Sequence, residues 1–377
     1  MKNVVHVISL LRELGGVQQS FISYYKYAQK YSKYKQYVYS THERSKKYGA
    51  FKNFFLIKKN IFSFLVHLYS RNSIIYFHNK LSSKIVYYLL KFMPSNNIIF
   101  HEHGEAWNVK TSEQKKIYQA NAKMANKIIV NSIATESMLI KKFKINEAKI
   151  KLAYYGFANP KIKKKKKKTK KNLQVGLIAR LESVKGAHIL IEAAKILRNK
   201  NIDFLIGGDG HLEKTLKKLS KNNNKVKFVG NVINPFDFIK KLDILVVPSI
   251  REPLGIVNIE AGYCKIPVIA SKVDGIPEVV FNNYSGVLIN PTKKINRRYS
   301  RGLPPLPNFV INPNTFDLSN PKEIDPKKLS KIILYLSKNE DLRLEYGYNL
   351  YKYVKSKFSI KNYFKRLESI CYNLDED

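Results

Sequence analysis

The chain has 377 residues, which is more than one hydrophobic core usually serves, so its length favours two domains. Hydrophobic residues make up 44% of the chain and charged residues 25%, and this balance excludes wholesale disorder. The 68 Lys and Arg against 28 Asp and Glu leave a formal charge of +40, which predicts anionic partners: nucleic acid, an anionic membrane surface or a phosphate-bearing substrate.

Short apolar runs typical of strands alternate with longer helical patterns along both halves of the chain. In the first half the predicted strands are 4–9, 37–41, 74–78, 98–100 and 127–131, and the predicted helices are 17–31, 81–92 and 133–143. In the second half the predicted strands are 173–179, 204–207, 226–229, 244–248 and 267–271, and the predicted helices are 187–197, 212–219 and 255–263. This alternation predicts a parallel, doubly wound α/β sheet in each half.

Two segments interrupt the alternation. Residues 159–171 are a run of Lys that repels itself and cannot pack, so we interpret it as an interdomain linker; a tether to nucleic acid or acidic lipid is the alternative. Residues 291–326 are rich in proline and predict a long surface loop or insertion. Helices near 327–338 and 340–372 close the chain. The expected parts are a first domain, the linker, a second domain and a C-terminal helix whose return to the first domain stays open: 1–158, 159–171, 172–350 and 351–377.

The chain shows no sign of secretion or of a membrane span. Cys264 and Cys371 are too few for a disulfide framework and lack the paired spacing of a zinc site, which favours a reducing compartment. The N-terminal apolar run is too short for a signal peptide, and Lys and His interrupt the most apolar stretch, 51–69, so no segment approaches the ~20 residues that cross a bilayer. We expect a cytoplasmic protein whose membrane contact is peripheral, at the inner face.

Candidate ligand loops follow the predicted strands, because ligands of doubly wound sheets gather at the carboxyl ends of the strands. After the first strand, the pair Gly15-Gly16 lets the backbone approach a phosphate or sugar; a tight turn is the equal alternative. After strand 98–100, His101-Glu-His103-Gly104 begins a dense polar cluster. Three interpretations are open for it: a metal site, satisfied surface histidines, or an imidazole that hydrogen-bonds a substrate hydroxyl or developing charge.

The loops of the second half carry charge. Arg180 and Lys185 follow its first strand and together suit a diphosphate, although two cations in six residues are common in so basic a chain. Gly207-Gly208-Asp209-Gly210 and Phe228-Val229-Gly230 follow the next two strands.

Two glutamates flank a glycine after the fourth strand of this half. Glu252 is expected in the loop and Glu260 on the following helix, whose start at Gly255 leaves N–H groups facing a pyrophosphate. Because Glu260 falls in a mostly apolar run, it is expected to be buried and to need a partner. Two carboxylates in these places suit a ligand with hydroxyls at both ends.

From Leu173 to about Val280 the ordered motifs resemble the donor-binding domain of family 4 glycosyltransferases, retaining enzymes with the GT-B fold of two Rossmann-like domains facing a cleft. The resemblance rests on Arg180 with Lys185-Gly186, Gly208-Asp209-Gly210, Phe228-Val229-Gly230, the paired glutamates, and the run from Ala270 to Glu278. It departs at Ala179, where the family has Gly, and at Tyr155-Gly156, where the family has Asn-Gly.

The resemblance implies a metal-independent hexosyltransferase that takes a sugar from a nucleotide sugar, UDP-sugar favoured over GDP-sugar, to a lipid or cell-envelope saccharide, as in glycolipid, lipopolysaccharide or polysaccharide biosynthesis. The first domain would bind the acceptor and the second the donor. The residues to which the resemblance gives catalytic roles are Arg180, Lys185, Glu252 and His103, the last favoured over His101. The residues to which it gives donor contacts are Gly15, Gly16, Gly208, Gly210, Val229, Leu254, Gly255, Ile256 and Glu260. It implies no metal and no cofactor beyond the nucleotide sugar.

Aromatic and basic residues alternate in 24–35 and again in 51–69, which favours docking of the first domain on anionic lipid; amphipathic helices with inward Tyr rings are an almost equal alternative. Lys is frequent almost everywhere, so part of the net charge is compositional. A basic nucleic-acid- or polyanion-binding protein without transferase activity is the competing class. We expect no nucleic-acid partner, because the sequence offers no recognised nucleic-acid module.

Overall fold

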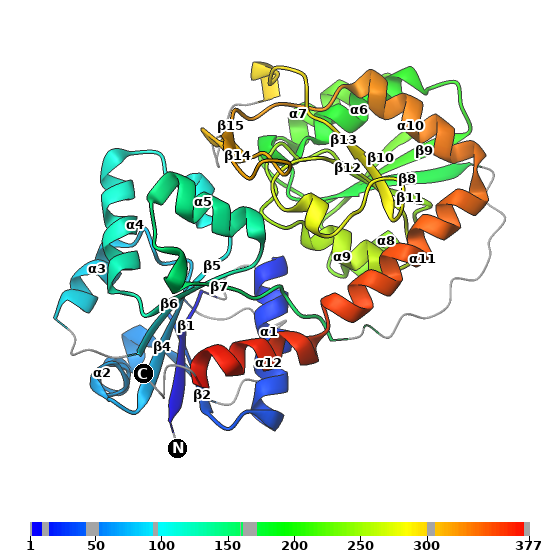
Figure 1. Ribbon diagram of the computed structural model, residues 1–377. Helices are drawn as coiled ribbons and strands as arrows, with labels where there is room; N and C mark the ends of the chain where they lie inside the picture. Colours follow the sequence, from blue (N-terminus) through cyan, green and yellow to red (C-terminus); the bar gives the residue numbers. More distant parts are fainter. Residues whose placement is uncertain are drawn as a thin grey trace. The chain divides into compact units, whose positions relative to one another are not determined.

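A computed structural model describes residues 2–9, 15–42, 53–92, 97–158, 160, 172–299 and 306–372. The chain forms two compact units, which are residues 1–158 with 358–377 and residues 159–357. The Lys run expected as a linker lies, apart from Pro160, outside the described residues. Figure 1 follows the chain from the N-terminal unit in blue and cyan to the C-terminal unit in green to orange.

The N-terminal unit is built on a seven-stranded parallel sheet with the order β3-β2-β1-β4-β5-β6-β7. Its strands are β1 Asn3–Val7, β2 Lys35–Ser40, β3 Phe54–Leu56, β4 Ser73–His78, β5 Asn97–Glu102, β6 Lys127–Val130 and β7 Ile150–Leu152. Its helices are α1 Gly16–Tyr31, α2 Ile61–Tyr69, α3 Lys84–Lys91, α4 Ser112–Met124, α5 Ile133–Phe143 and α12 Ile360–Tyr372. All six residues of β4 are buried, as expected for a central strand covered on both faces.

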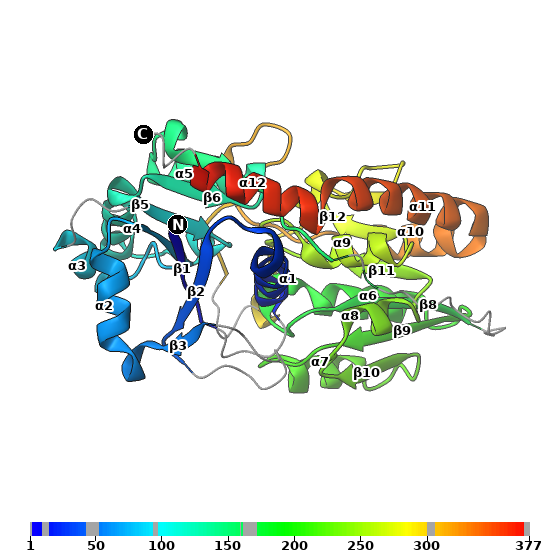
Figure 2. The same cartoon turned by 90° about the horizontal axis from the view of Figure 1, so that it is seen from below.

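The C-terminal unit repeats this topology with a six-stranded parallel sheet of order β10-β9-β8-β11-β12-β13. Its strands are β8 Leu173–Ile178, β9 Ile202–Gly207, β10 Val226–Gly230, β11 Ile244–Val247, β12 Val268–Ser271 and β13 Gly286–Ile289. Its helices are α6 Ala187–Ile196, α7 Glu213–Ser220, α8 Pro235–Ile239, α9 Ile256–Tyr263, α10 Pro326–Lys338 and α11 Glu340–Lys357. Two Rossmann-like α/β units confirm the predicted fold class; Figure 2 shows both sheets from below.

The strand order of each sheet reverses once, between β1 and β4 in the N-terminal unit and between β8 and β11 in the C-terminal unit. The loops that leave the two strands at such a switch point turn to opposite sides and leave a crevice beyond the carboxyl ends. These two places are therefore where ligand groups are to be sought.

The end of the chain differs from the expectation. The expected boundary at 351 falls inside α11, which packs on α9 of the C-terminal unit. The chain changes unit only at Phe358, and α12 then packs on α1 of the N-terminal unit. Gly156 permits this approach, because a Cβ there would lie 2.4 Å from the Cβ of Tyr363. One continuous helical pattern over 340–372 is thus two helices, broken at Phe358-Ser359.

The proline-rich segment is not simply a surface loop. Within its described part, β14 Val310–Ile311 and β15 Leu318–Ser319 form an antiparallel pair, and both residues of β14 are buried. The backbone N–H of Ile311 donates to Asp274 Oδ1 over 2.7 Å, so the segment packs against a loop of the C-terminal sheet. Residues 300–305 of the segment lie outside the described part.

Candidate functional site

Backbone segments meet closely at the switch point of the C-terminal sheet, and glycines make this possible. A Cβ on Gly186 would lie 2.1 Å from the carbonyl oxygen of Pro248, and one on Gly208 would lie 1.9 Å from that of Ala179. Gly210 meets the backbone of Leu181 in the same way at 2.7 Å. All three glycines have positive φ. The loops after β8, β9 and β11 are therefore locked together by contacts that only glycine allows.

One ion pair spans the switch point. Lys185, from the loop after β8, places Nζ 2.6 Å from Oε2 of Glu252, from the loop after β11. Ser249 Oγ donates to the same carboxylate oxygen over 3.2 Å. Both charged side chains are mostly buried, but 17% of the Lys185 side chain and 12% of the Glu252 side chain remain exposed, so a ligand can still contact the pair. The structure thus brings together two of the residues predicted to be catalytic.

Arg180 belongs to the same loop but is more open. Its Nη1 donates to Glu182 Oε1 over 2.7 Å, and its side chain remains 49% exposed. Five charged groups influence one another here, since the pKa of buried Arg251 responds to Arg180, Glu182, Glu252 and Asp274 after the dominant effect of burial, which lowers it.

Glu260 lies on α9, as predicted, and its buried carboxyl group lacks a hydrogen-bond partner among the described residues. Its side chain is on a residue only 5% exposed, and burial raises its pKa to about 8. Within the described part of the chain, no hydrogen bond or ion pair reaches its carboxylate. A buried carboxyl without a partner costs free energy, so a ligand that supplies hydroxyl donors is expected to bind it.

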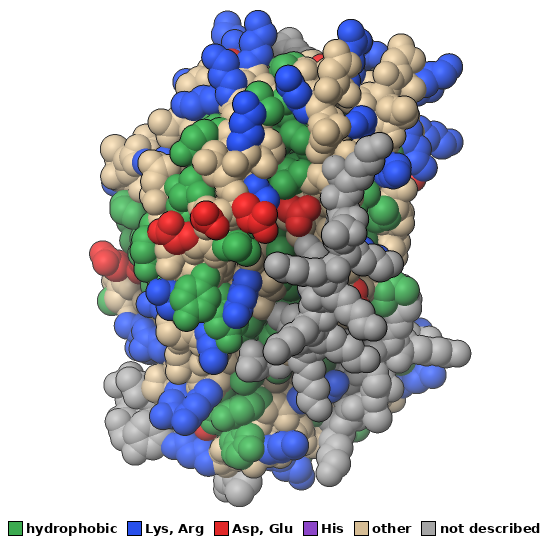
Figure 3. Space-filling model, turned by 90° about the vertical axis from the view of Figure 1, so that its right-hand side faces the viewer, with side chains coloured by type: hydrophobic (Ala, Val, Ile, Leu, Met, Phe, Trp, Pro, Cys, Tyr) green, Lys and Arg blue, Asp and Glu red, His purple; other side chains and the backbone are tan. Residues whose placement is uncertain are grey.

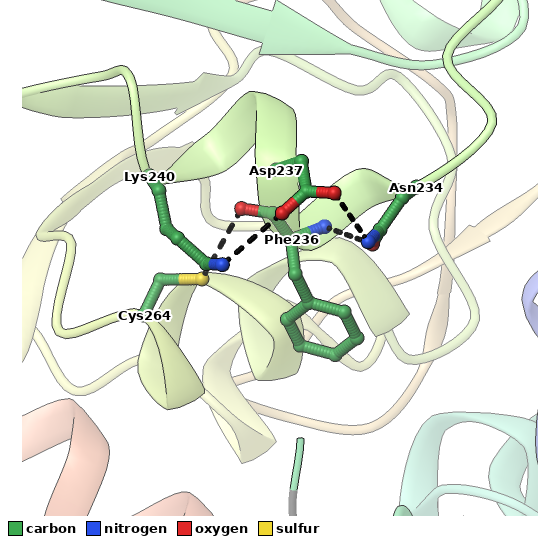
Figure 4. A network of polar contacts seen from close by, with 5 residues as sticks. All are labelled: Asn234, Phe236, Asp237, Lys240 and Cys264. Atoms are coloured by element: carbon green, nitrogen blue, oxygen red, sulfur yellow. Dashed lines mark hydrogen bonds and ion pairs between the residues drawn. The ribbon is translucent and has the colours of Figure 1, made fainter. Parts of the chain in front are cut away.

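Helix α9 is anchored at its C-terminal end by the start of α8 (Figure 4). Asn234 caps α8 by accepting from the N–H of Phe236 over 3.1 Å, and its amide donates to Asp237, which also accepts from Lys240. The thiol of Cys264, directly after α9, donates to the Phe236 carbonyl over 3.8 Å. Burial raises the pKa of Cys264 to about 12, so this thiol acts as a structural donor and keeps α9 in place.

The remaining predicted donor contacts of the C-terminal unit lie around this site with one outlier. Gly255 precedes α9 with a φ of 85°, Ile256 is the first residue of the helix, and Leu254 is buried before them. Val229 lies at the end of the edge strand β10 and is 47% exposed. Its neighbour Gly230 is linked to the site, because the Gly230 carbonyl accepts from the N–H of Gly208.

In the N-terminal unit, Gly15 and Gly16 are placed at the start of α1, after the loop that leaves β1. Gly15 is the N-cap and Gly16 the first helical residue. A Cβ on Gly15 would lie 2.3 Å from Oε1 of Gln18. Residues 10–14, which complete the loop, lie outside the described part. The position at a switch point agrees with a ligand loop, while the ligand itself remains a proposal.

The polar cluster after β5 is a buried network. His101 pairs with His78 of β4 in the sheet register, and His6 of β1 lies beside them. His6, His78 and His101 are buried and His103 is half-buried, so His101 is not a surface histidine. Burial lowers the pKa of His6 to about 4 and that of His103 to about 3. These rings are therefore neutral near pH 7.

Two glutamates fix the turn that carries His103. Glu102 Oε1 accepts from the N–H groups of Gly104 and Ala106, and its Oε2 accepts from the Tyr118 hydroxyl. Glu105 accepts from the N–H groups of Leu81 and Ser82. Burial, with Glu105 nearby, raises the pKa of Glu102 to about 7. Glu102 thus holds the backbone of the turn itself, and Glu105 ties the turn to the loop after β4.

Sequence reasoning gave no role to several residues that shape the site. Asp274, with a φ of 45°, accepts from the N–H of Glu252 over 2.8 Å and so positions the loop after β11. Glu182 holds Arg180 as described. His78 is hydrogen-bonded to the His103 ring, and His6 is hydrogen-bonded to His78. Asp274 and Glu182 were inside the quoted motifs, where a carboxylate in a tight loop is a detectable signal; His6 and His78 look like ordinary strand residues.

Residues 158–300 match the family model of glycosyl transferases group 1. The capsular polysaccharide biosynthesis glycosyltransferase CapM of Staphylococcus aureus is 26% identical over 273 residues, which cover 70% of this chain and 60% of that protein. A segment of 122 residues is 36% identical to an uncharacterized glycosyltransferase of Methanocaldococcus jannaschii and covers 30% of this chain and 31% of that one. Sequence similarity thus supports a glycosyltransferase.

Solved structures share the fold at low identity. HepE of Anabaena, in complex with UDP and glucose, superposes with a TM-score of 0.77 and 17% identity over 99% of this chain and 100% of that one. WaaG, a glycosyltransferase involved in lipopolysaccharide biosynthesis, gives a TM-score of 0.66 and 14% identity over 97% and 99%. The chain therefore has the GT-B fold.

Proposed function

We propose that this chain, whose residues 158–300 match the glycosyl transferases group 1 model, is a retaining glycosyltransferase that moves a hexosyl group from a UDP-sugar to a lipid or cell-envelope saccharide. The observation that carries the proposal is the switch point of the C-terminal sheet. There an ion pair joins Lys185 to Glu252, and the buried carboxyl of Glu260 has no partner in the described part of the chain.

The diphosphate of the donor is proposed to bind Arg180 and Lys185. Both cations lie in the loop that follows β8. The start of α9 at Gly255 adds backbone N–H groups that favour anions. Negative charge grows on the diphosphate as the sugar leaves, so these groups stabilise the transition state more than the ground state. Because they can neutralise that charge themselves, we propose that transfer needs no metal ion.

Glu260 is proposed to bind the ribose hydroxyls, and Glu252 the transferred sugar. A ribose hydroxyl donated to Glu260 would satisfy its buried carboxyl and favour the ionised form, so donor binding should lower its raised pKa. When the donor binds, the ammonium of Lys185 would move from Glu252 towards the diphosphate, and the Glu252 carboxylate would then accept a hydrogen bond from a sugar hydroxyl. The UDP complexes of HepE support the choice of UDP over GDP.

The acceptor is proposed to be bound by the N-terminal unit at a membrane surface. Helix α2 exposes Phe62 and helix α3 exposes Ile85, each to 81%. Tyr69, Tyr88 and Phe92 of the same region are also exposed. Lys58 and Lys59 precede α2 in the sequence, and Lys91 ends α3. Such a mixture of apolar and cationic side chains suits anionic lipid. No helix in the described ranges is long and apolar enough to cross a bilayer, so the contact we propose is peripheral.

Lipid docking is testable with a matched pair of double variants. Phe62→Ser with Ile85→Ser should reduce co-sedimentation with vesicles that contain anionic lipid by about 10-fold or more, because two exposed apolar side chains are lost from the contact. Tyr335→Ser with Leu344→Ser, which removes two apolar groups of the C-terminal unit that are 58% and 62% exposed, should not. Equal partition of the wild-type protein onto neutral and anionic vesicles would contradict electrostatic docking.

The donor assignment is tested by nucleoside diphosphate release from a panel of UDP- and GDP-sugars, with and without lipid and saccharide acceptors and with a chelator present. We expect release from one UDP-sugar, stimulated by an acceptor. Release from none of them, combined with salt-sensitive binding to nucleic acid, would favour the competing polyanion-binding class. On the face in Figure 3, Lys and Arg side chains lie on both sides of a row of acidic side chains.

A further inference from the structure

A single chain of hydrogen bonds runs through the buried histidines of the N-terminal unit. Gln36 Oε1 lies 2.9 Å from His6 Nε2, and His6 Nδ1 lies 3.2 Å from His78 Nε2. His78 Nδ1 lies 3.0 Å from His103 Nε2, and His103 Nδ1 lies 2.6 Å from the Tyr155 hydroxyl. Every ring nitrogen of these three histidines has a protein partner.

The direction of the chain is set at its Gln36 end. The Gln36 amide nitrogen donates to the Tyr34 carbonyl and to Ser32 Oγ, which itself donates to the carboxylate of Glu368 on α12. A carbonyl and an already donating hydroxyl accept only, so the nitrogen of the amide must face them. The oxygen of Gln36 therefore faces His6, and His6 must carry its proton on Nε2.

This assignment propagates through the rings because each is neutral. His6 Nδ1 then accepts, so His78 is protonated on Nε2; His78 Nδ1 accepts in turn, so His103 is also protonated on Nε2. His103 Nδ1 is left as an acceptor for the Tyr155 hydroxyl, which accepts from the Asn131 amide over 2.8 Å. The rings of His78 and His103 are nearly parallel, with planes 2° and centroids 5.3 Å apart, a separation that leaves room for the N–H···N bond between their edges.

A metal ion is the competing occupant of this cluster, because nitrogens of His78, His101 and His103 lie within 4.8 Å of one another. The ring geometry favours the hydrogen-bond chain. His101 is stacked on His103, with ring centroids 4.0 Å and planes 26° apart. Stacked rings do not direct their in-plane lone pairs at one point about 2 Å from each nitrogen, as zinc requires.

We propose that His6, His78 and Gln36 are positioning residues that fix His103 as a neutral ring whose second nitrogen, Nδ1, which faces the Tyr155 hydroxyl, is a hydrogen-bond acceptor. A ligand that reaches this nitrogen must replace the Tyr155 hydroxyl and must therefore be a donor. The ring therefore suits a donor such as a hydroxyl of a sugar or acceptor, and it disfavours the oxygen of an ionised phosphate, which can only accept. The identity of the substrate that presents this hydroxyl rests on the proposed transferase function, whereas the assignment of the tautomers does not depend on it.

This chain of hydrogen bonds orients the His103 ring and does not conduct a proton away from it. Passing a proton inward from Tyr155 would end with protonation of the Gln36 amide oxygen, which is a very weak base. His6 and His78 therefore act through His103, and neither is assigned a contact with substrate. Sequence separation of 72 residues between His6 and His78 makes this a property of the fold, created where β1 pairs with β4.

The tautomers can be read directly by NMR of the protein labelled with ¹⁵N in histidine side chains. We expect His6, His78 and His103 to be neutral at pH 7 with the proton on Nε2. A matched pair at one position tests the linkage: His78→Gln can still accept from His103 and donate to His6, whereas His78→Leu can do neither. In His78→Leu the His103 ring should show mixed tautomers, and in His78→Gln it should keep the proton on Nε2.

Turnover gives a second readout. His78→Leu should lower kcat for transfer about 10- to 100-fold with KM for the nucleotide sugar little changed, and His78→Gln should recover most of it. An Nδ1 proton on His103 in the wild-type protein would overturn the inference, as would one equivalent of Zn²⁺ bound by wild type and lost in His78→Leu. If no nucleotide sugar is turned over, the proposed function fails while the NMR result still decides the tautomers. If His78→Leu does not fold, wild type and His78→Gln suffice for that decision.

Discussion

The two units share one sheet topology, yet their switch points are chemically opposite. At the C-terminal switch point, charged side chains meet across the crevice and an ion pair joins the two loops. At the N-terminal switch point, β1 and β4 contribute neutral histidines joined by hydrogen bonds. This difference agrees with the proposal that the C-terminal edge binds an anion and the N-terminal edge an uncharged, hydroxyl-bearing ligand.

The difference teaches how a repeated fold is specialised. Glycines in the C-terminal loops bring backbones together so that a few cations and carboxylates face one place. In the N-terminal unit, burial within the sheet lowers the histidine pKa values and keeps the rings neutral. A charged donor and an uncharged acceptor group are what a transferase has to distinguish.

The largest expected effect comes from removing the cations of the C-terminal switch point. Arg180→Ala with Lys185→Ala should reduce turnover roughly 100- to 1,000-fold or more, since the charge that develops on the diphosphate loses its partners. Nucleoside diphosphate release measures this. Lys195→Ala, which removes a half-buried lysine on α6 of the same unit, is the control. Undiminished turnover in a folded double variant would break the proposed division of charge between the units.

The next effect concerns the glycines that lock the charged loops. Gly186→Ala should destabilise the C-terminal unit by several kcal/mol, because its Cβ would lie 2.1 Å from the Pro248 carbonyl oxygen. Gly230 has almost the same φ, 68° against 67°, but nothing within 4 Å of a Cβ, so Gly230→Ala should cost only about 1–2 kcal/mol. Urea unfolding compares them. Equal losses in the two variants would mean that close packing at the switch point is unimportant.

The smallest effect is a difference in pH dependence between the units. Glu260 binds its proton up to about pH 8 when folded but only to about pH 4.5 when unfolded, so its contribution to stability falls as pH rises between these values. Glu260→Gln should abolish that slope, a change of at most a few kcal/mol in the unliganded protein. His6, with its pKa lowered to about 4, has the opposite sign: its contribution is lost as pH falls from 6.5 towards 4.

Thermal unfolding at a series of pH values checks both slopes. The difference between wild type and Glu260→Gln isolates the carboxyl, and the difference between wild type and His6→Gln isolates the imidazole. Glu102, whose pKa is raised to about 7, opposes the histidines within the N-terminal unit, but it is common to wild type and variant and cancels. If the wild-type minus Glu260→Gln difference and the wild-type minus His6→Gln difference changed with pH in the same direction, the opposite pH dependence assigned to the two units would be contradicted.

Strand positions and charged loops could be predicted from the sequence because both depend on neighbours along the chain. Arg180, Lys185, Glu252 and Glu260 each lie within a few residues of a predicted strand end or helix start, and the structure places the first three around one crevice. The break between α11 and α12 was missed, since the helical pattern continues across Phe358-Ser359 while the packing partner changes.

The histidine chain was beyond sequence reasoning for a physical reason. His6 and His78 become neighbours only through the register of β1 with β4, and Gln36 joins them through β2. His6 stands inside an apolar strand pattern, where a single polar residue is an ordinary exception. Likewise, the partnership of Asp274 with Glu252 depends on how the loop after β12 returns to the loop after β11. Contacts of this kind follow from tertiary pairing and leave no local pattern.

The most direct test of the central claim is a calorimetric titration of UDP into the protein in the presence of a chelator. We predict one site, weakened at least about 10-fold by Glu260→Gln and abolished in the Arg180→Ala, Lys185→Ala double variant, with GDP bound more weakly than UDP. Equal UDP affinity in wild type and double variant would contradict the assignment of the C-terminal switch point as the donor site.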